Sequence, residues 1–289
     1  MVTAIWVALI LMALWFIYLL AGDIIKHKDV LEKVSIIKTS IIGFVVNFFD
    51  VLGIGSFAPQ TALLKFTGQT EDRIIPGTLN VSNAIPVLLQ ALIFIQIVEV
   101  EPVTLLLMIA AATAGSVIGA GIVSKLPERK VRLTMGIALL AAAFFMLAGK
   151  LNWIPGGGEA IGLEGGKLIF ASVINFVLGA LMTAGIGLYA PCMALVFALG
   201  MSPRVAFPIM MASCAFLMPA ASARFIKEGA YNRKASASIA IAGSIAVLIA
   251  AFIVKSLPLD ILRWVVIAVI IYTSVIMLRA AFTAKSKSI

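Results

Sequence analysis

Charged residues are scarce in this chain. They make up 12% of its 289 residues, whereas hydrophobic residues make up 62%. A chain of this size cannot bury so much apolar surface inside a soluble globule, so the sequence predicts an integral membrane protein. Apolar stretches of near-spanning length recur at 2–21, 39–64, 77–98, 103–124, 133–149, 168–200, 205–223, 235–254 and 264–278.

Histidine and cysteine are almost missing. His27 lies in a basic loop, and Cys192 and Cys214 lie in apolar stretches without the spacing of metal ligands or a redox motif. No nucleotide-binding loop is present either. We therefore predict no enzyme, no metal site and no cofactor. The net charge of +9 comes from Lys and Arg in short loops between apolar stretches, which indicates membrane topology rather than a nucleic-acid partner.

The first apolar stretch, 2–21, has two possible interpretations. It could be a cleaved signal peptide, but it lacks a basic n-region and a convincing small-residue cleavage site, and it is long and apolar for an h-region. We expect a membrane-spanning helix here.

A seven-residue pattern occurs twice, as GIGSFAP at 53–59 and GIGLYAP at 185–191. A second pair follows with a one-residue slip, IVSKLPERKVR at 122–132 and IVKSLPLDILR at 253–263. Two such blocks in the same order indicate an internal duplication. The expected organisation is an N-terminal helix with a basic cytoplasmic loop (1–34), a first repeat (35–152), a glycine-rich external linker (153–167) and a second repeat (168–289).

Basic residues concentrate in four clusters: Lys26, Lys28, Lys33 and Lys38; Lys125, Arg129, Lys130 and Arg132; Arg224, Lys227, Arg233 and Lys234; and Arg279, Lys285 and Lys287. The positive-inside rule places all four in the cytoplasm. If 39–64 crossed the membrane fully, the second cluster would lie outside. If 39–64 and 168–200 instead turn back at their glycines, all four clusters lie inside.

The predicted fold is therefore an all-α polytopic membrane protein with two inverted-topology repeats. Each repeat is a re-entrant helical hairpin plus three transmembrane helices, and one extra N-terminal helix precedes them. The N-terminus is expected outside and the C-terminus in the cytoplasm. This is an architecture of secondary transporters.

The glycines and prolines explain how the hairpins turn. Gly53, Gly55, Gly185 and Gly187 permit positive φ or close backbone approach, and Pro59 and Pro191 suit the first turn of a new helix. Short helices are expected at roughly 58–67 and 190–200, with their N-termini near the membrane centre. Each N-terminus carries about half a positive charge and unpaired N–H groups, so an anion would satisfy both. Alternatively, the glycines and prolines are only kinks or packing sites.

Polar residues around the breaks complete the candidate site. The predicted substrate-binding residues are Gly53, Gly55, Ser56, Pro59, Gln60, Thr61, Asn80, Asn83, Gly185, Gly187, Tyr189, Pro191, Cys192 and Ser213. Taken alone, Tyr189 and Cys192 favour a packing role over a binding role. Asn47 and Asp50 are assigned a role in proton coupling or a structural role, since an acid in an apolar stretch either titrates or binds the freed amides.

The chain resembles the sulfite exporter TauE/SafE family. The likeness is carried by the duplicated glycine-rich break followed by proline, by PGTLN at 76–80 and by LPERKVRLTMG at 126–136, and it covers the chain from about residue 39 onward. It implies a bacterial inner-membrane permease that exports sulfite or organosulfonates bound between the repeats, where Gly53, Gly55, Pro59, Gly185, Gly187 and Pro191 would line the site. The chain departs from the family pattern at GIGSF, where three glycines are typical, and at Asn47 and Asp50, which replace small residues.

We therefore expect a carrier that works by alternating access, coupled to the proton motive force, with lipid and a small anion as partners. The alternative is an uncoupled channel or facilitator for small anions. The oligomeric state does not follow from the sequence.

Overall fold

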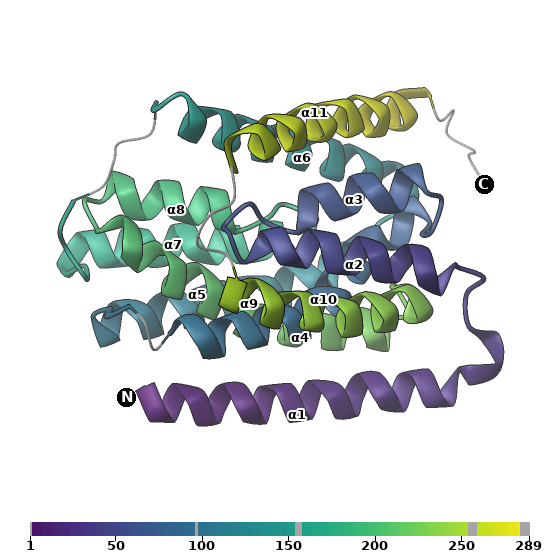
Figure 1. The fold of residues 1–289 in the computed structure, drawn as a ribbon, viewed down its shortest axis with the longest axis horizontal. Helices are drawn as coiled ribbons and strands as arrows, with labels where there is room; N and C mark the ends of the chain where they lie inside the picture. Colours follow the sequence, from purple (N-terminus) through teal and green to yellow (C-terminus); the bar gives the residue numbers. More distant parts are fainter. Residues whose placement is uncertain (1, 96–97, 154–157, 254–258, 284–289) are drawn as a thin grey trace.

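The computed structural model describes residues 2–95, 98–153, 158–253 and 259–283, and these residues form helices joined by loops, without β-strands. Figure 1 shows the helices as a roughly aligned bundle. They are α1 (Val2–Lys26), η1 (Lys28–Val30), α2 (Ile36–Asp50), α3 (Phe57–Phe66), η2 (Asp72–Ile74), α4 (Ile75–Phe94), α5 (Pro102–Val123), α6 (Glu128–Lys150), α7 (Gly165–Met182), α8 (Tyr189–Ala198), α9 (Pro203–Lys227), α10 (Arg233–Ile253) and α11 (Leu259–Thr283).

Seven helices in the described residues are long and apolar enough to cross a membrane. They are α1, α4, α5, α6, α7, α9 and α10. Six of them are among the full spans expected from the sequence, whereas α7 is the first arm of the expected second hairpin. The remaining expected span, 264–278, lies in α11. The apolar part found in this helix, Ile270–Thr283, is shorter than the seven spanning helices. The chain is a multi-pass helical membrane protein.

The two predicted helix breaks are confirmed. The first apolar stretch ends its helix at Asp50 and begins another at Phe57, and the second does so at Met182 and Tyr189. Gly53, Gly55 and Gly185 have φ of 79°, 86° and 100°, a backbone conformation that residues with a Cβ rarely adopt.

The expectation for Gly187 was partly wrong, because its φ is not positive. A Cβ there would lie 3.9 Å from Phe57 Cβ, which is an ordinary contact. Pro59 and Pro191 each occupy the third position of the new helix, where their missing N–H has no helical acceptor in any case.

The two halves of the chain pack in the same way. The first half contributes α2 to α6 and the second α7 to α11, in corresponding order. α5 packs on α7 as α10 packs on α2, and α5 packs on α9 as α10 packs on α4. α3 contacts α11 as α8 contacts α6. Exchanging the halves therefore reproduces the main helix contacts, which agrees with the duplication seen in the sequence.

Corresponding helices that touch run antiparallel. In α4 and α9, the backbone N–H of Asn232 beyond the end of α9 donates to the Thr78 hydroxyl near the start of α4, at 3.0 Å. At the other end, the rings of Phe94 and Phe207 lie 6.4 Å apart. In α6 and α11, Arg129 donates to the Ala281 carbonyl and Ser274 to the Gly136 carbonyl.

The pair formed by α4 and α9 is the centre of the bundle. In an apolar 18-residue window of each helix, 72% of the residues of α4 and 83% of those of α9 are buried inside the protein. The corresponding share is 22% for α1, which lies on the outside of the bundle (Figure 1). Its apolar outer residues fit a helix that faces lipid, since hydrocarbon does not oppose their exposure.

The segments that carry the basic clusters meet at one end of the bundle. Arg233 donates to Asp23 at 2.7 Å, Lys125 lies 4.0 Å from Glu228, and Arg129 donates to the carbonyl of Ala281. These contacts join the end of α1 to the start of α10, the end of α5 to the end of α9, and the start of α6 to the end of α11.

The acidic segment VEVEP at 98–102 and the glycine-rich linker at 153–167, which are both expected outside the cell, meet through a different set of contacts. The backbone N–H of Glu101 donates to the Ile161 carbonyl at 2.9 Å, and the Thr104 hydroxyl is hydrogen-bonded to the backbone of Leu163. The sequence-based grouping of the loops into two sets is therefore reproduced by contacts within each set.

Candidate functional site

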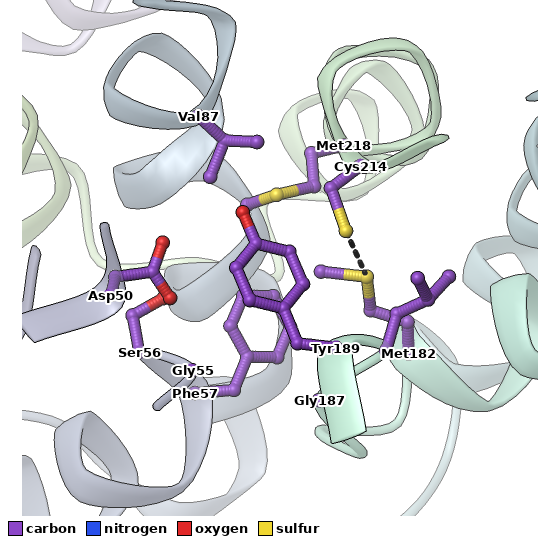
Figure 2. A pocket seen from close by; sticks show the side chains of 11 residues that line it. Asp50, Gly55, Ser56, Phe57, Val87, Met182, Gly187, Tyr189, Cys214 and Met218 are labelled. Atoms are coloured by element: carbon purple, nitrogen blue, oxygen red, sulfur yellow. Dashed lines mark hydrogen bonds between the residues drawn. The ribbon is translucent and has the colours of Figure 1, made fainter. Parts of the chain in front are cut away.

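A small pocket lies between the two helix breaks, at the centre of the fold. It has a volume of about 20 Å³, which is room for roughly one water molecule. Figure 2 shows it bounded by the end of α2, both breaks, α4 and α9. Its lining residues are Asp50, Gly55, Ser56, Phe57, Val87, Met182, Gly187, Leu188, Tyr189, Cys214 and Met218.

A second pocket of about 20 Å³ adjoins the breaks and is lined by matching positions of the two repeats. Its lining residues are Ile54, Gly55, Phe57, Ala58, Gly187, Tyr189 and Ala190. Gly55, Phe57, Gly187 and Tyr189 line both pockets, so these residues form the wall that the two pockets share. Phe57 and Tyr189 occupy the same position in the two repeats and open α3 and α8.

The starts of α3 and α8 leave backbone N–H groups without helical acceptors. The first intrahelical bonds run from Gln60 to Ser56 and from Cys192 to Leu188, both at 2.9 Å. The two N–H groups that precede each bond belong to Phe57 and Ala58 in α3, and to Tyr189 and Ala190 in α8. All four residues line the second pocket. The pocket walls therefore carry the positive ends of two helix dipoles.

Asp50 is the acidic residue of the site. It ends α2 and is 2% exposed, and its Oδ2 accepts a hydrogen bond from Gln90 Nε2 at 2.7 Å. The Ser56 hydroxyl and backbone N–H lie beside the same carboxyl group (Figure 2). Gln90 Oε1 in turn accepts from the Tyr189 hydroxyl at 3.1 Å. Asp50, Gln90 and Tyr189 thus form a chain that joins α2, α4 and α8.

The acid has no counterpart in the second repeat, where Met182 occupies the matching position. No Lys, Arg or His lines the first pocket. The site is therefore asymmetric: a carboxyl group faces the start of α3, while the start of α8 faces a thioether.

A separate polar network holds α2, α3 and α4 together. Asn47 Nδ2 donates to Asn83 Oδ1 at 3.0 Å, and Asn83 Nδ2 donates to Gln60 Oε1 at 2.7 Å. Gln60 Nε2 donates to the Ser82 hydroxyl at 2.9 Å. All four side chains are fully buried and line neither pocket. Their amide groups already donate within the network and do not point into the pockets. The network therefore holds the first hairpin against α4.

The structure brings only part of the predicted site together. Gly55, Ser56, Gly187, Tyr189 and Asp50 line the pockets, whereas the remaining predicted residues do not: Asn47, Gly53, Pro59, Gln60, Thr61, Asn80, Asn83, Gly185, Pro191, Cys192 and Ser213.

The residues outside the pockets have other contacts. Thr61 and Asn80 donate to the carbonyls of Phe57 and Pro76, and Ser213 accepts from Asn175. Gly53 faces the ring of Phe207, and Gly185 faces Met135.

Gln90 is the polar residue that sequence reasoning missed. It bonds both Asp50 and Tyr189, but it lies in the apolar part of α4, away from the marked polar run at 78–83. A buried amide in an otherwise apolar span is itself a signal of a functional or packing role. Apolar side chains carry no local mark of a pocket, and the lining residues missed for this reason are Ile54, Phe57, Ala58, Val87, Met182, Leu188, Ala190, Cys214 and Met218.

Comparison with known proteins identifies the family. The model of the sulfite exporter TauE/SafE family matches residues 1–146. The match includes α1, the first break, Asp50 and Gln90. It therefore begins earlier than the likeness seen in the sequence and ends before the second repeat.

No curated protein and no solved structure matches the chain. The family model covers just over half of the chain. The family is described as sulfite exporters, which agrees with a transporter rather than an enzyme. The chain belongs to the sulfite exporter TauE/SafE family.

Proposed function

We propose that this protein is a secondary transporter that exports a small sulfur oxyanion, sulfite or an organosulfonate, across the bacterial inner membrane by alternating access. The observation that carries the proposal is the meeting of two helix starts, from matching positions of two repeats, around one central pair of pockets. The family supports the substrate class.

The proposed architecture is a pair of inverted repeats, each with one hairpin and three spans. A two-fold axis in the membrane plane turns each helix end for end, so corresponding helices in contact run antiparallel, as α4 with α9 and α6 with α11 do. An axis along the membrane normal would make them parallel. With the basic end in the cytoplasm, the N-terminus lies outside and the C-terminus inside.

The free N–H groups at the two helix starts supply a binding environment for an anion. Each helix start carries about half a positive charge, and a nearby negative charge is stabilised without a buried lysine or arginine. A pocket with room for one water cannot hold a sulfite ion. Binding of sulfite in the pocket therefore requires α3 and α8 to move apart. A site that must open to bind its substrate favours a carrier over a permanently open pore.

Asp50 couples the site to protons in this proposal. An ionised Asp50 opposes a bound anion, whereas a protonated Asp50 does not, so protonation and anion binding favour each other. If one proton travels with a doubly charged sulfite, one net negative charge leaves the cell. An interior-negative membrane potential drives that charge outward by about 2.3 kcal/mol per 100 mV.

The test is uptake of isethionate into proteoliposomes that contain the purified protein. This sulfonate remains ionised at all working pH values, so its own protonation cannot mimic coupling. With the membrane potential clamped at zero, an acidic exterior should drive saturable uptake above the external concentration. An uncoupled channel would equilibrate the anion without accumulation. Absence of protein-dependent flux of both isethionate and sulfite would refute the transport function.

A further inference from the structure

Gln90 stands between the acid of the site and the aromatic wall of the pockets. A glutamine amide has a donor end and an acceptor end, and both ends are used here. The donor end faces the Asp50 carboxylate at 2.7 Å, and the acceptor end receives the Tyr189 hydroxyl at 3.1 Å. All three side chains are buried, so these hydrogen bonds lie away from bulk water.

We propose that Gln90 is a positioning residue that transmits the protonation state of Asp50 to Tyr189, and so links proton binding to the wall between the two pockets. The inference rests on the proposed proton coupling and extends it to a residue and a mechanism.

The ionised state fixes the direction of the chain. A carboxylate only accepts hydrogen bonds, so Gln90 must turn its NH₂ group toward Asp50. Its carbonyl oxygen then faces Tyr189, whose hydroxyl donates. Tyr189 is held in the wall shared by the two pockets as long as Asp50 carries its charge.

Protonation reverses the chain. A hydronium ion gives its proton to one carboxyl oxygen of Asp50 and becomes water, and the new O–H group donates to the Gln90 carbonyl after the amide rotates. The NH₂ group of Gln90 then faces the Tyr189 oxygen, so the tyrosine hydroxyl must accept and direct its own proton elsewhere. No covalent bond other than the O–H bond on Asp50 is made. Tyr189 then accepts from Gln90 instead of donating to it, and its own hydroxyl proton needs a new acceptor. Protonation of Asp50 therefore weakens the hold on Tyr189 and favours opening of the wall between the pockets.

The surroundings of Asp50 leave few competing titratable groups. α2 contacts α3, α4 and α10. α4 has no titratable side chain, and the Lys65 of α3 is bonded to Asp72. In α10, Arg233 and Lys234 stand at the helix start, and the rest of the helix carries none. Across the pocket, Asp50 faces the weak acids Tyr189 of α8 and Cys214 of α9, and Ser56 at the break.

The relay can be tested without a substrate, by infrared difference spectroscopy of the purified protein between acidic and alkaline buffers. We expect a protonated-carboxyl band that is lost in Asp50→Asn, accompanied by a tyrosine band that is lost in Tyr189→Phe. In Gln90→Met, which keeps the side-chain length but removes the amide, the carboxyl band should remain while the tyrosine band no longer changes. A tyrosine band that still responds in Gln90→Met, or that never responds in the wild type, overturns the relay.

Isethionate flux supplies the second readout. Gln90→Met should lower uptake driven by the pH step by roughly tenfold, within the usual range of coupling between two sites, and lower exchange at equal pH by a clearly smaller factor. Ser222→Ala is the matched control, because Ser222 is the buried counterpart of Gln90 in the second repeat and its hydroxyl has no partner. An equal loss of both fluxes in Gln90→Met indicates a merely structural role and rejects the relay. If wild-type protein carries neither anion, the exporter proposal fails, while the infrared result still decides the relay.

Discussion

Arg132 donates through Nε to the carboxylate of Asp72 at 2.8 Å, and thereby ties the first turns of α6 to the segment that follows the first hairpin. The same carboxylate accepts from Lys65 of α3 through both oxygens, at 2.6 and 2.7 Å. Asp72 is 8% exposed, so its charge is largely removed from water. One carboxylate thus holds the far end of α3, the start of α4 and α6 in one arrangement.

Asp72→Asn is expected to destabilise the protein by about 3 kcal/mol, because it leaves two partly buried cations without their shared partner. The measurement is the thermal unfolding midpoint in detergent. Glu128→Gln is the control, since Glu128 pairs with the same Arg132 but is 49% exposed, and an exposed pair contributes about 0 to 1 kcal/mol. Equal midpoints for the two variants would contradict a structural role of Asp72.

The glycines of the two breaks give a matched pair of substitutions. Gly55 has φ of 86°, whereas its counterpart Gly187 does not have a positive φ. Gly55→Ala should cost about 1–2 kcal/mol of stability through the left-handed backbone alone, since nothing lies within 4 Å of the added Cβ. Gly187→Ala should cost less. Unfolding midpoints of the two variants compare them directly, and a larger loss in Gly187→Ala would show that the breaks are not shaped as described.

Close packing of α5 on α7 also depends on glycine. A Cβ on Gly115 would collide with the carbonyl oxygen of Phe176, and one on Gly179 with that of Ala112. Gly115→Ala is therefore expected to destabilise the protein by about 1–3 kcal/mol through overpacking. Gly22→Ala in α1 should be neutral or slightly stabilising, because no atom lies within 4 Å of its Cβ and alanine favours helix. If Gly115→Ala left the unfolding midpoint unchanged, α5 and α7 would have to lie farther apart than the structure shows.

The helix breaks could be predicted from the sequence because backbone conformation leaves a local mark. Gly53, Gly55 and Gly185 adopt the positive φ that their residue type permits, and the repeated pattern pointed to both breaks at once. The short helices begin within one residue of the expected positions. The grouping of the loops was predictable too, because charge asymmetry follows the membrane sides.

The partners of the polar side chains could not be predicted in the same way. Gln60 and Asn83 belong to the expected segments, but they bond each other and not the pocket, since a buried amide takes whichever partner the packing brings near. Gln90 pairs with Tyr189 across 99 positions of the sequence. Contacts of that range depend on how α4 meets α8, and one sequence contains no signal of it.

Glu101 makes the start of α5 sensitive to acid. Its carboxylate accepts from the backbone N–H groups of Thr104 and Val103. The hydrogen bond of the Thr104 side chain first, and then these two backbone hydrogen bonds, lower the pKa of Glu101 below its usual value. A lowered pKa in the folded state means that the stabilisation is present at neutral pH. It is lost as the pH falls below about 4.3, the ordinary value for glutamate, and through the lower folded value.

The unfolding midpoint of Glu101→Gln should therefore lie below that of the wild type at pH 7 and approach it in acid. The exposed Glu99 supplies the control, because Glu99→Gln removes the same charge nearby without removing a helix cap. A constant difference between Glu101→Gln and wild type at all pH values would mean that the carboxylate does not act as the cap.

The orientation of the chain can be decided by labelling single cysteines from outside the cell. Glu99→Cys lies in the acidic segment 98–102, which is expected outside, and Lys125→Cys, where the native side chain is 61% exposed, lies in the second basic cluster. The native Cys192 and Cys214 are buried and should stay silent. A membrane-impermeant maleimide should label Glu99→Cys in intact cells and Lys125→Cys only after permeabilisation. If 39–64 crossed the membrane fully, Lys125→Cys would react in intact cells, because one more crossing reverses the side of every residue that follows.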